Sequence, residues 1–172
     1  MNIRNAGEED LDGIMGLVAR LVDMTDGYWD EEYPAREHFE ESLAHDGLYV
    51  AEKDGRIIAT CGIEPAEGVF AELDCWSKDH KRPCTGSRLG VDPDYQGRHI
   101  PDRIISFALE DSLRRHSYDS MHFLVARCNT RAINVYDREG FRRVGEAKFF
   151  DVDFYCYECE LPFVIRKEKE RP

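Results

Sequence analysis

Apolar residues recur at helical spacing in two long stretches of the chain. The first begins after a run of acidic residues, and its apolar side is expected to belong to the core; it contains Leu11, Ile14, Met15, Val18, Leu21 and Val22. The second ends close to three basic residues, whose charge suits a helix C-terminus; it contains Ile104, Ile105, Ala108, Leu109 and Leu113. Two further helices are expected at approximately 35–45 and at 129–137, the latter capped by Asn129 or Thr130 and stopped by Gly140.

Short apolar runs between these helices predict strands. We expect them at 2–6, 48–52, 56–63, 85–91, 121–126, 141–147 and 149–161. The turn Asp54-Gly55 makes the second and third runs an antiparallel hairpin. Gly86 and Gly90 permit a bulge in the fourth strand. The pattern predicts one domain over residues 1–165 and a charged tail at 166–172, whereas the segment 64–82 has no clear period and is left unassigned.

Composition and charge limit the classes of function. The chain has 172 residues, of which 42% are hydrophobic and 34% charged, as in a globular protein. It lacks an apolar run long enough to span a membrane and begins without a signal-peptide core, so we expect a cytoplasmic protein without membrane partners. The formal net charge of −12 argues against nucleic acid as a partner and suits a cationic, amine-bearing acceptor.

Residues 89–103 combine the end of a strand, a turn broken by an Asp-Pro pair, and the start of a helix at Ile100. A helix that starts in this way leaves its first backbone N–H groups unpaired, and such groups bind phosphate readily. Gly97 lets a ligand approach the backbone closely, and Arg98 and Arg103 add positive charge. The stretch therefore predicts a site for a phosphorylated cofactor, although an ordinary connection with surface arginines has the same pattern.

Two motifs in this order resemble those of the GNAT superfamily of N-acetyltransferases. The first consists of Val91, Pro93, Tyr95, Gln96, Gly97 and Arg98. The second follows some thirty residues later and consists of Asn129, Ala132, Ile133, Val135, Tyr136, Gly140 and Phe141. In that family, the first segment binds the pyrophosphate of acetyl-CoA, and the second carries a tyrosine that faces the thioester sulfur.

The resemblance implies an α/β fold of mixed α+β character. Its central sheet would be mixed and mostly antiparallel, with about six to seven strands, about four flanking helices and a splay between strands four and five. The resemblance also implies acetyl-CoA as the acyl donor. The cofactor-binding residues that it implies are Leu89, Gly90, Val91, Gln96, Gly97, Arg98, His99, Ile100, Pro101, Asp102, Asn129, Ala132 and Tyr136.

The resemblance also suggests roles in a direct attack of an amine on the thioester. The backbone N–H near Val91 would stabilise the oxyanion, and Tyr136 would protonate the departing thiolate. Packing of Tyr136 into the buried face of its helix is the alternative interpretation. For the base that deprotonates the amine we select Glu64, with Asp74, His80 and ordered water as alternatives.

The chain departs from the family pattern at two positions of the phosphate turn. His99 stands where the family usually has glycine, and Pro101 stands where it usually has glycine or alanine. The imidazole of His99 would either crowd the pyrophosphate or donate a hydrogen bond to it, and Pro101 removes one N–H donor from the turn. These departures motivate a second hypothesis, a catalytically silent member of the fold that binds acyl-CoA as a sensor or serves as an interaction module.

Further predictions concern the acceptor, metals and assembly. Residues 24–34 interleave aromatic and acidic side chains, which either receive a cationic acceptor or fold back onto the core. The acceptor is expected to be a primary amine of a small molecule or a protein. We expect the six cysteines to be free thiols and no metal to be bound. The alternative is a zinc site, and with it a metal-binding regulatory protein, in which Cys156 and Cys159 have the spacing of metal ligands and Cys75, His80 and Cys84 could complete the site. A homodimer formed through the last strand is left open.

Overall fold

The computed structural model describes residues 1–22, 24, 29–149 and 151–163. Within them the chain forms seven strands and four α-helices. Two compact units can be distinguished: the first contains Met1–Glu64 and Gly86–His116, and the second contains Pro65–Thr85 and Ser117–Pro172. Each unit is described by itself below.

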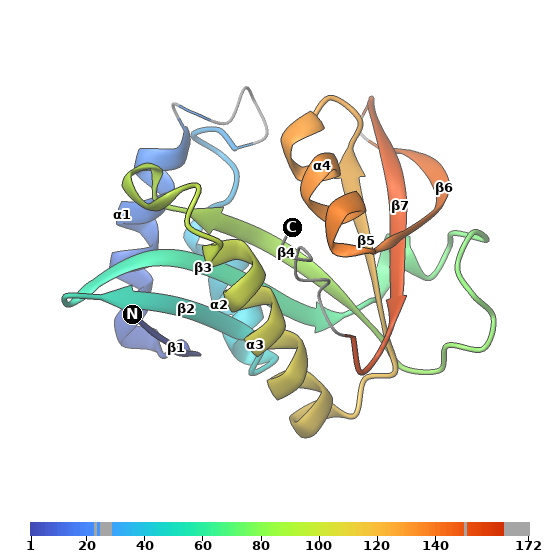
Figure 1. Cartoon of the computed structure of the whole chain (residues 1–172), viewed down its shortest axis with the longest axis horizontal. Helices are drawn as coiled ribbons and strands as arrows, with labels where there is room; N and C mark the ends of the chain where they lie inside the picture. Colours follow the sequence, from blue (N-terminus) through green and yellow to red (C-terminus); the bar gives the residue numbers. More distant parts are fainter. Residues whose placement is uncertain (23, 25–28, 150, 164–172) are drawn as a thin grey trace, which may run out of the picture. The chain divides into compact units, whose positions relative to one another are not determined.

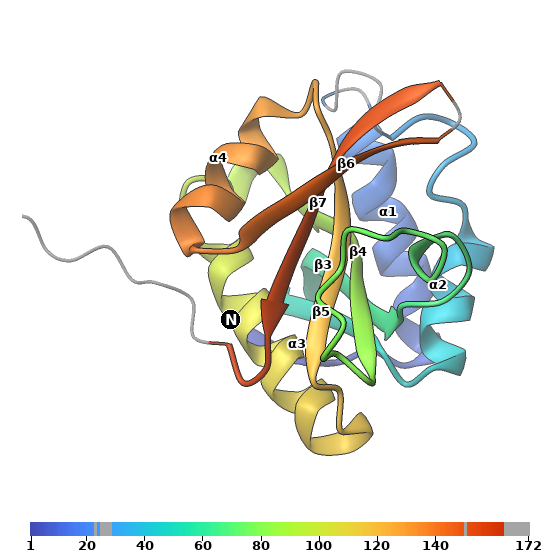
Figure 2. The ribbon, with the colours of Figure 1, turned by 90° about the vertical axis from the view of Figure 1, so that its right-hand side faces the viewer.

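The first unit contains three antiparallel strands and three α-helices. The strands β1 (Asn2–Asn5), β2 (Leu48–Lys53) and β3 (Arg56–Pro65) pair in sequence order, and the Asp-Gly turn joins the last two as expected. Helices α1 (Leu11–Val22) and α2 (Arg36–Ala44) cover one face of these strands. Helix α3 (Ile100–His116) covers the other face (Figures 1 and 2).

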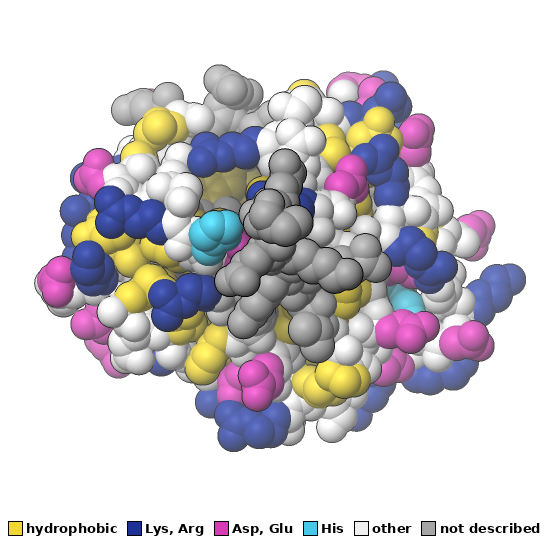
Figure 3. All heavy atoms as spheres, in the orientation of Figure 1, with side chains coloured by type: hydrophobic (Ala, Val, Ile, Leu, Met, Phe, Trp, Pro, Cys, Tyr) yellow, Lys and Arg dark blue, Asp and Glu magenta, His cyan; other side chains and the backbone are white. Residues whose placement is uncertain are grey.

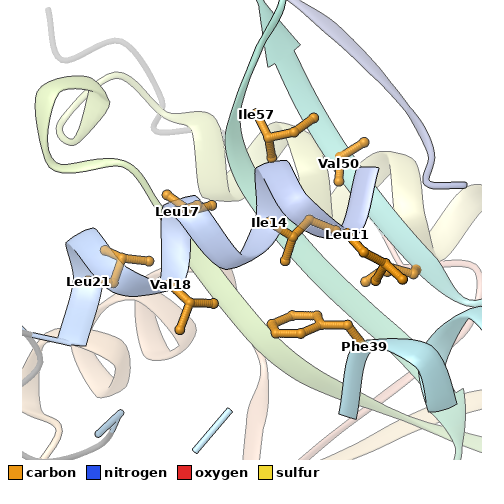
Figure 4. Packing of buried hydrophobic residues seen from close by; sticks show 9 residues of the cluster. Leu11, Ile14, Leu17, Val18, Leu21, Phe39, Val50 and Ile57 are labelled. Carbon is orange, nitrogen blue, oxygen red and sulfur yellow. The ribbon is translucent and has the colours of Figure 1, made fainter. Parts of the chain in front are cut away.

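The core of this unit follows the apolar periodicity of α1. Figure 4 shows its side chains pointing towards Phe39 of α2 and towards Val50 and Ile57 of the hairpin. Ile14 and Phe39 are fully buried. Burial of each such side chain contributes about 1.5–3 kcal/mol, so the amphipathic pattern of α1 is sufficient to fix this helix on the sheet. The buried members of the cluster are Leu11, Ile14, Leu17, Val18, Leu21, Phe39, Leu48, Val50 and Ile57.

The second unit contains β5 (Ser120–Ala126), α4 (Thr130–Glu139), β6 (Arg142–Phe149) and β7 (Val152–Glu160). Strand β7 pairs antiparallel with both β5 and β6. Successive residues of a strand face opposite sides, so the sheet carries two different sets of side chains. One set faces α4, and the other faces the segment 65–82 (Figure 2).

The strand β4 (Pro83–Val91) contributes residues to both units. Hydrogen-bonded neighbours follow the order β1-β2-β3-β4-β5-β7-β6. The pairing of β4 with β5 is parallel and is found only at the beginning of β4, where Pro83 lies opposite Ser120 and Cys84 lies opposite Met121. The expected mixed, mostly antiparallel sheet with a splay after the fourth strand is therefore confirmed.

The structure refines several sequence predictions. Of the unassigned segment, Glu64 and Pro65 extend β3, and the residues after them form turns and bends with one short 3-10 turn, Gly68–Phe70. In β4 the left-handed residue is Arg88, with φ of 47°, and not one of the two glycines that we expected to permit a bulge. An ion pair with Glu64 holds the Arg88 side chain, which helps to stabilise this costly backbone conformation.

Some predictions fall partly on residues outside the described ranges. These are residues 25–28 of the aromatic and acidic loop and residues 166–172 of the expected tail. Of the described loop residues, Trp29 packs against the core of the first unit, as the second interpretation of the loop predicts. No helix in the described part of the chain is both long and apolar enough to cross a membrane.

Candidate active site

The phosphate turn of the first unit is anchored by a buried carboxylate. Asp92 is fully buried; its side chain accepts the N–H of Asp94 at 3.0 Å and caps the 3-10 turn Pro93–Tyr95. Its carboxylate also pairs with Arg20, at 2.9 Å, and with Arg56. The buried carboxylate thus links the turn to α1 and to the hairpin, which makes it a firm support for the backbone that follows.

The backbone after Tyr95 offers several donors in sequence. The Gln96 side chain donates to the carbonyl oxygen of Val91 at 3.2 Å, which closes the turn back onto the end of β4. The amides of residues 97–100 make no backbone hydrogen bond to another residue of the described ranges. Unpaired amides at a helix N-terminus, together with the helix dipole, attract phosphate.

Two residues of this turn adopt the left-handed backbone conformation. Gly97 has φ of 74° and His99 has φ of 55°. Glycine reaches this region without a steric penalty, whereas other residues reach it at a cost. The exposed imidazole of His99 lies 3.0 Å from Asp102 in the first turn of α3. Pro101 also lies in this first turn, where the missing N–H costs the helix nothing.

Cationic side chains surround the turn. Arg98 and Lys53 lie over the ring of Tyr95, with their charged groups 5.3 Å and 5.1 Å from its centroid. Within the face drawn in Figure 3, Lys and Arg side chains lie among acidic ones, so the large negative net charge does not make this face uniformly acidic. Local positive charge beside the turn suits a pyrophosphate despite the acidity of the whole chain.

Gly90 permits a close approach at the end of β4. A Cβ at this position would lie 2.6 Å from the Trp29 ring and 2.8 Å from Leu21. The backbone of Gly90 is not left-handed, so packing and not backbone conformation requires glycine at this position. The neighbouring cofactor candidate Leu89 is half-buried, and Val91 is buried.

We expect Gly90→Ala to lower the free energy of unfolding by about 1–3 kcal/mol, because the added methyl group overpacks the contact with the indole. Gly16→Ala is a matched control, since a Cβ there meets nothing within 4 Å. In the interior of α1 the same substitution should raise stability by about 1 kcal/mol. Urea unfolding of both variants tests the prediction, and equal effects on the two glycines would contradict it.

The candidate base Glu64 is held by several donors. Its Oε1 accepts hydrogen bonds from Arg88, from Ser42 and, at 3.3 Å, from Ser87. The side chains of both Glu64 and Arg88 are largely buried. These donors fix the orientation of the carboxylate at the end of β3. Of the alternatives, Asp74 is exposed and His80 contacts another histidine in the second unit.

The second motif forms the helix α4 of the second unit. Asn129 is its N-cap and accepts the N–H of Ala132 at 3.0 Å, which decides between the two expected caps. Gly140 ends the helix in the left-handed conformation, as predicted. Asn129 and Gly140 therefore set the start and the end of the helix that carries Tyr136.

The half-buried Tyr136 lies among aromatic rings of the second unit. Its ring makes an edge contact with Phe123 at a centroid distance of 4.7 Å and lies 5.5 Å from Phe141 and 6.0 Å from Tyr157. The hydroxyl of Tyr157 donates to Asp137 at 2.7 Å, and burial together with this bond raises the pKa of Tyr157. Packing thus holds the ring of Tyr136, as expected for either of its two interpretations.

Sequence reasoning did not identify two residues that support these sites. Asp92 could have been identified, because an Asp-Pro pair places a capping side chain before a proline at the first position of a turn. Arg88 gave no signal in the sequence, because its importance comes from a left-handed backbone and a contact with Glu64 that lies more than twenty residues away.

Comparisons with known proteins agree with this architecture. Residues 17–141 match the profile of a family described as the acetyltransferase (GNAT) family. No curated protein matches the chain. A GNAT-family acetyltransferase from Streptococcus agalactiae is similar in structure, with a TM-score of 0.71 and 18% identity over 97% of this chain and 96% of its own.

Two other solved structures are similar to the same extent. The ribosomal-protein-alanine N-acetyltransferase of Brucella melitensis has a TM-score of 0.70 and 19% identity over 94% of this chain and 100% of its own. A Salmonella typhimurium protein solved with its cofactor acetyl-CoA has a TM-score of 0.70 and 17% identity over 98% of both chains. At these identities the likeness shows the fold, and the family profile carries the assignment.

Proposed function

Because the chain belongs to the acetyltransferase (GNAT) family, we propose that it transfers the acetyl group of acetyl-CoA to a primary amine. One observation carries the proposal: the amides of residues 97–100 lack backbone partners within the described ranges and lie between a turn anchored by the buried Asp92 and the start of α3. This arrangement suits a diphosphate ester. The second motif supplies a tyrosine on a well-capped helix.

The proposed cofactor contacts follow the two motifs. The backbone of Leu89, Gly90 and Val91 would pair with the pantetheine arm, and the turn from Gln96 to Asp102 would hold the pyrophosphate. Gln96 contributes by fixing the turn through its bond to Val91. Asn129 and Ala132 would act through the position of α4, because the asparagine side chain is engaged in capping this helix.

In the proposed reaction, the neutral amine attacks the thioester carbonyl and forms the new C–N bond. Negative charge develops on the carbonyl oxygen, where the Val91 amide would stabilise it. The C–S bond then breaks, and Tyr136 protonates the thiolate to give free coenzyme A. The amine proton passes to a base, for which Glu64 is the proposed acceptor, directly or through water.

The acceptor is proposed as an amine on a small molecule or a protein. The Brucella melitensis enzyme is named for a protein acceptor, which gives protein amines a place in this proposal. The net charge of −12 favours cationic acceptors of either kind. The proposal further includes a cytoplasmic location, no nucleic acid or membrane partner, and a homodimer as a state to be tested by size-exclusion chromatography with light scattering.

Two measurements separate the hypotheses. Isothermal titration with acetyl-CoA tests cofactor binding, and release of free thiol in the presence of a mixed amine library tests transfer. We expect both signals. Binding without thiol release for any amine would instead support the silent acyl-CoA sensor, and the absence of binding would contradict both hypotheses.

We expect His99→Gly to leave the acetyl-CoA dissociation constant unchanged or to lower it. Glycine adopts the left-handed backbone at position 99 without the steric cost that histidine has there. The substitution also removes an exposed side chain that pairs with Asp102 beside the turn. Gly97→Ala is the opposite test, because a Cβ there meets no atom within 4 Å and only the backbone is strained. That variant should lose about 1–2 kcal/mol of stability. A large loss of affinity in His99→Gly would show that the imidazole is a ligand of the phosphate.

A further inference from the structure

Three side chains of the second unit point their ligand atoms at a common centre. His80 lies in the segment before β4, His122 on β5 and Glu158 on β7. The last two are directly opposite each other in the pairing of β5 with β7, so they face the same side of the sheet. This side carries the segment 65–82, and it is the side opposite to Phe123, which faces Tyr136.

The distances between the three atoms fit the size of a metal ion. His80 Nδ1 lies 2.8 Å from His122 Nε2, and Glu158 Oε2 lies 3.9 Å from the first and 3.8 Å from the second. The carboxylate is too far from either imidazole for a hydrogen bond. The nearest point equidistant from the three atoms lies in their plane, about 2.1 Å from each, which is the length of zinc bonds to histidine nitrogen and carboxylate oxygen. A tetrahedral ion would widen the 2.8 Å separation of the two imidazole nitrogens.

The carboxylate and one imidazole are held in place by neighbours that do not belong to the cluster. Ser77 donates to Glu158 with its N–H at 2.9 Å and its hydroxyl at 2.6 Å, and Arg142 pairs with the same carboxylate. The Trp76 ring stacks on the His122 ring at 4.5 Å. The Ser77 N–H donates to Oε2, whereas the Ser77 hydroxyl and Arg142 bind Oε1. Partners of this kind orient metal ligands in proteins, and Oε2 retains a second lone pair for an ion on the side of the two histidines.

His80 lacks a complete set of hydrogen bonds in this arrangement. Its side chain is only 7% exposed, and its buried Nε2 has no hydrogen-bond partner within the described ranges. Among the residues that the structure describes, the nitrogen of another imidazole is the one hydrogen-bond partner of its Nδ1. An ion bound to Nδ1 would leave Nε2 unpaired, so the observation that points to an ion is Nδ1, whose neighbours are the two other ligand atoms.

We propose that His80, His122 and Glu158 bind a divalent transition-metal ion of the Zn²⁺ class. Two imidazoles and one carboxylate form a donor set that zinc accepts, whereas Mg²⁺ and Ca²⁺ prefer oxygen ligands alone. Three protein ligands leave a fourth position for water or another donor. The neighbouring residues Lys78 and Asp79 are exposed, so the segment that carries His80 is open to solvent next to the cluster.

This site differs from the zinc site that the sequence suggested. Within the described residues, the cysteines considered there form no disulfide, and Cys75 contacts Cys156. Of the proposed cysteine and histidine ligands, only His80 belongs to the converging set. A bound ion would fasten the segment 65–82 to β5 and β7, which is a role independent of acyl transfer.

The test uses the full chain, freed of metal by a chelator and titrated with Zn²⁺ and with Co²⁺. We expect binding of one ion per chain and a rise of the melting temperature by about 5–10 °C at a hundred times the dissociation constant. Co²⁺ should quench the fluorescence of Trp76, and Trp76→Phe should remove this quenching. The Co²⁺ complex should lack thiolate charge-transfer absorption, because no cysteine is a ligand.

Variants distinguish this site from binding elsewhere. His80→Gln, His122→Gln and Glu158→Gln should each lower Zn²⁺ affinity by more than about 100-fold. His80→Gln is the decisive variant, because position 80 lies outside the strands and the substitution should disturb the sheet least. The melting temperature of the metal-free variant shows whether the fold is intact. The exposed His45→Gln is the matched control and should bind as the wild type does. Failure of the wild type to bind, or loss of binding in Cys75→Ser with retention in His80→Gln, would overturn the proposal.

Discussion

Tyr136→Phe should lower kcat by about 100-fold or more while changing the KM for acetyl-CoA by less than about threefold. The substitution removes only the hydroxyl, so the ring contacts with Phe123 and Phe141 remain. The fold and the cofactor contacts of α4 should therefore persist. What is lost is the proposed proton donor to the thiolate, a group that would act in the transition state and not in cofactor binding.

Steady-state kinetics with thiol detection, using an amine found in the library screen, measures this effect. Tyr155→Phe is the matched control, because it removes a hydroxyl from β7 and preserves the ring on which Arg143 stacks at 3.9 Å. The control should keep its kcat within about twofold of the wild type. An unchanged kcat in Tyr136→Phe would remove this residue from the mechanism and leave it as a packing residue of the second unit.

Asp92→Ala should lower the free energy of unfolding by about 2–4 kcal/mol, because a buried cap and two charge-assisted hydrogen bonds are lost together. Breaking a fully buried ion pair costs about 3–5 kcal/mol. We expect a smaller loss here, because Arg20 and Arg56 are themselves about half-exposed and water can hydrate them once the carboxylate is removed. The loss also frees the turn that follows Val91. We therefore expect weaker acetyl-CoA binding as well as lower stability.

Asp94→Ala provides a sensitive control for this prediction. Asp94 pairs with the same Arg20 at 2.8 Å, but its side chain is 67% exposed. Exposed ion pairs contribute about 0–1 kcal/mol, so this variant should unfold close to the wild type and bind acetyl-CoA normally. Urea unfolding and isothermal titration of the two variants measure both effects. Similar losses for Asp92→Ala and Asp94→Ala would show that burial is not the cause.

Local signals predicted the elements of the fold well. The apolar period of α1, the Asp-Gly turn between β2 and β3, and the Asn129 and Gly140 limits of α4 each act within a few residues, and each is found in the structure. Such signals depend on backbone chemistry and on which face of an element is apolar. The segment 64–82 had no periodicity, and after the end of β3 at Pro65 it forms turns and bends with one short 3-10 turn.

Local motifs predicted some residues of the candidate site, and contacts between distant parts of the chain decided the others. The sequence pointed to the phosphate turn and to Tyr136 because the spacing of the two motifs is local. It did not show that Asp92 supports the turn through Arg20 and Arg56, or that Arg88 holds Glu64. These are contacts between residues that are distant in the chain, and no periodicity encodes which charged pairs will meet.

By itself, the sequence determined the type and order of the elements and the family to which the chain belongs, because helix and strand periods, caps and turn residues are properties of short segments. Only the tertiary structure decided which polar side chains share a buried environment. His80, His122 and Glu158 illustrate the reason: strand pairing places two of them opposite each other, and a segment without periodicity carries the third to the same centre.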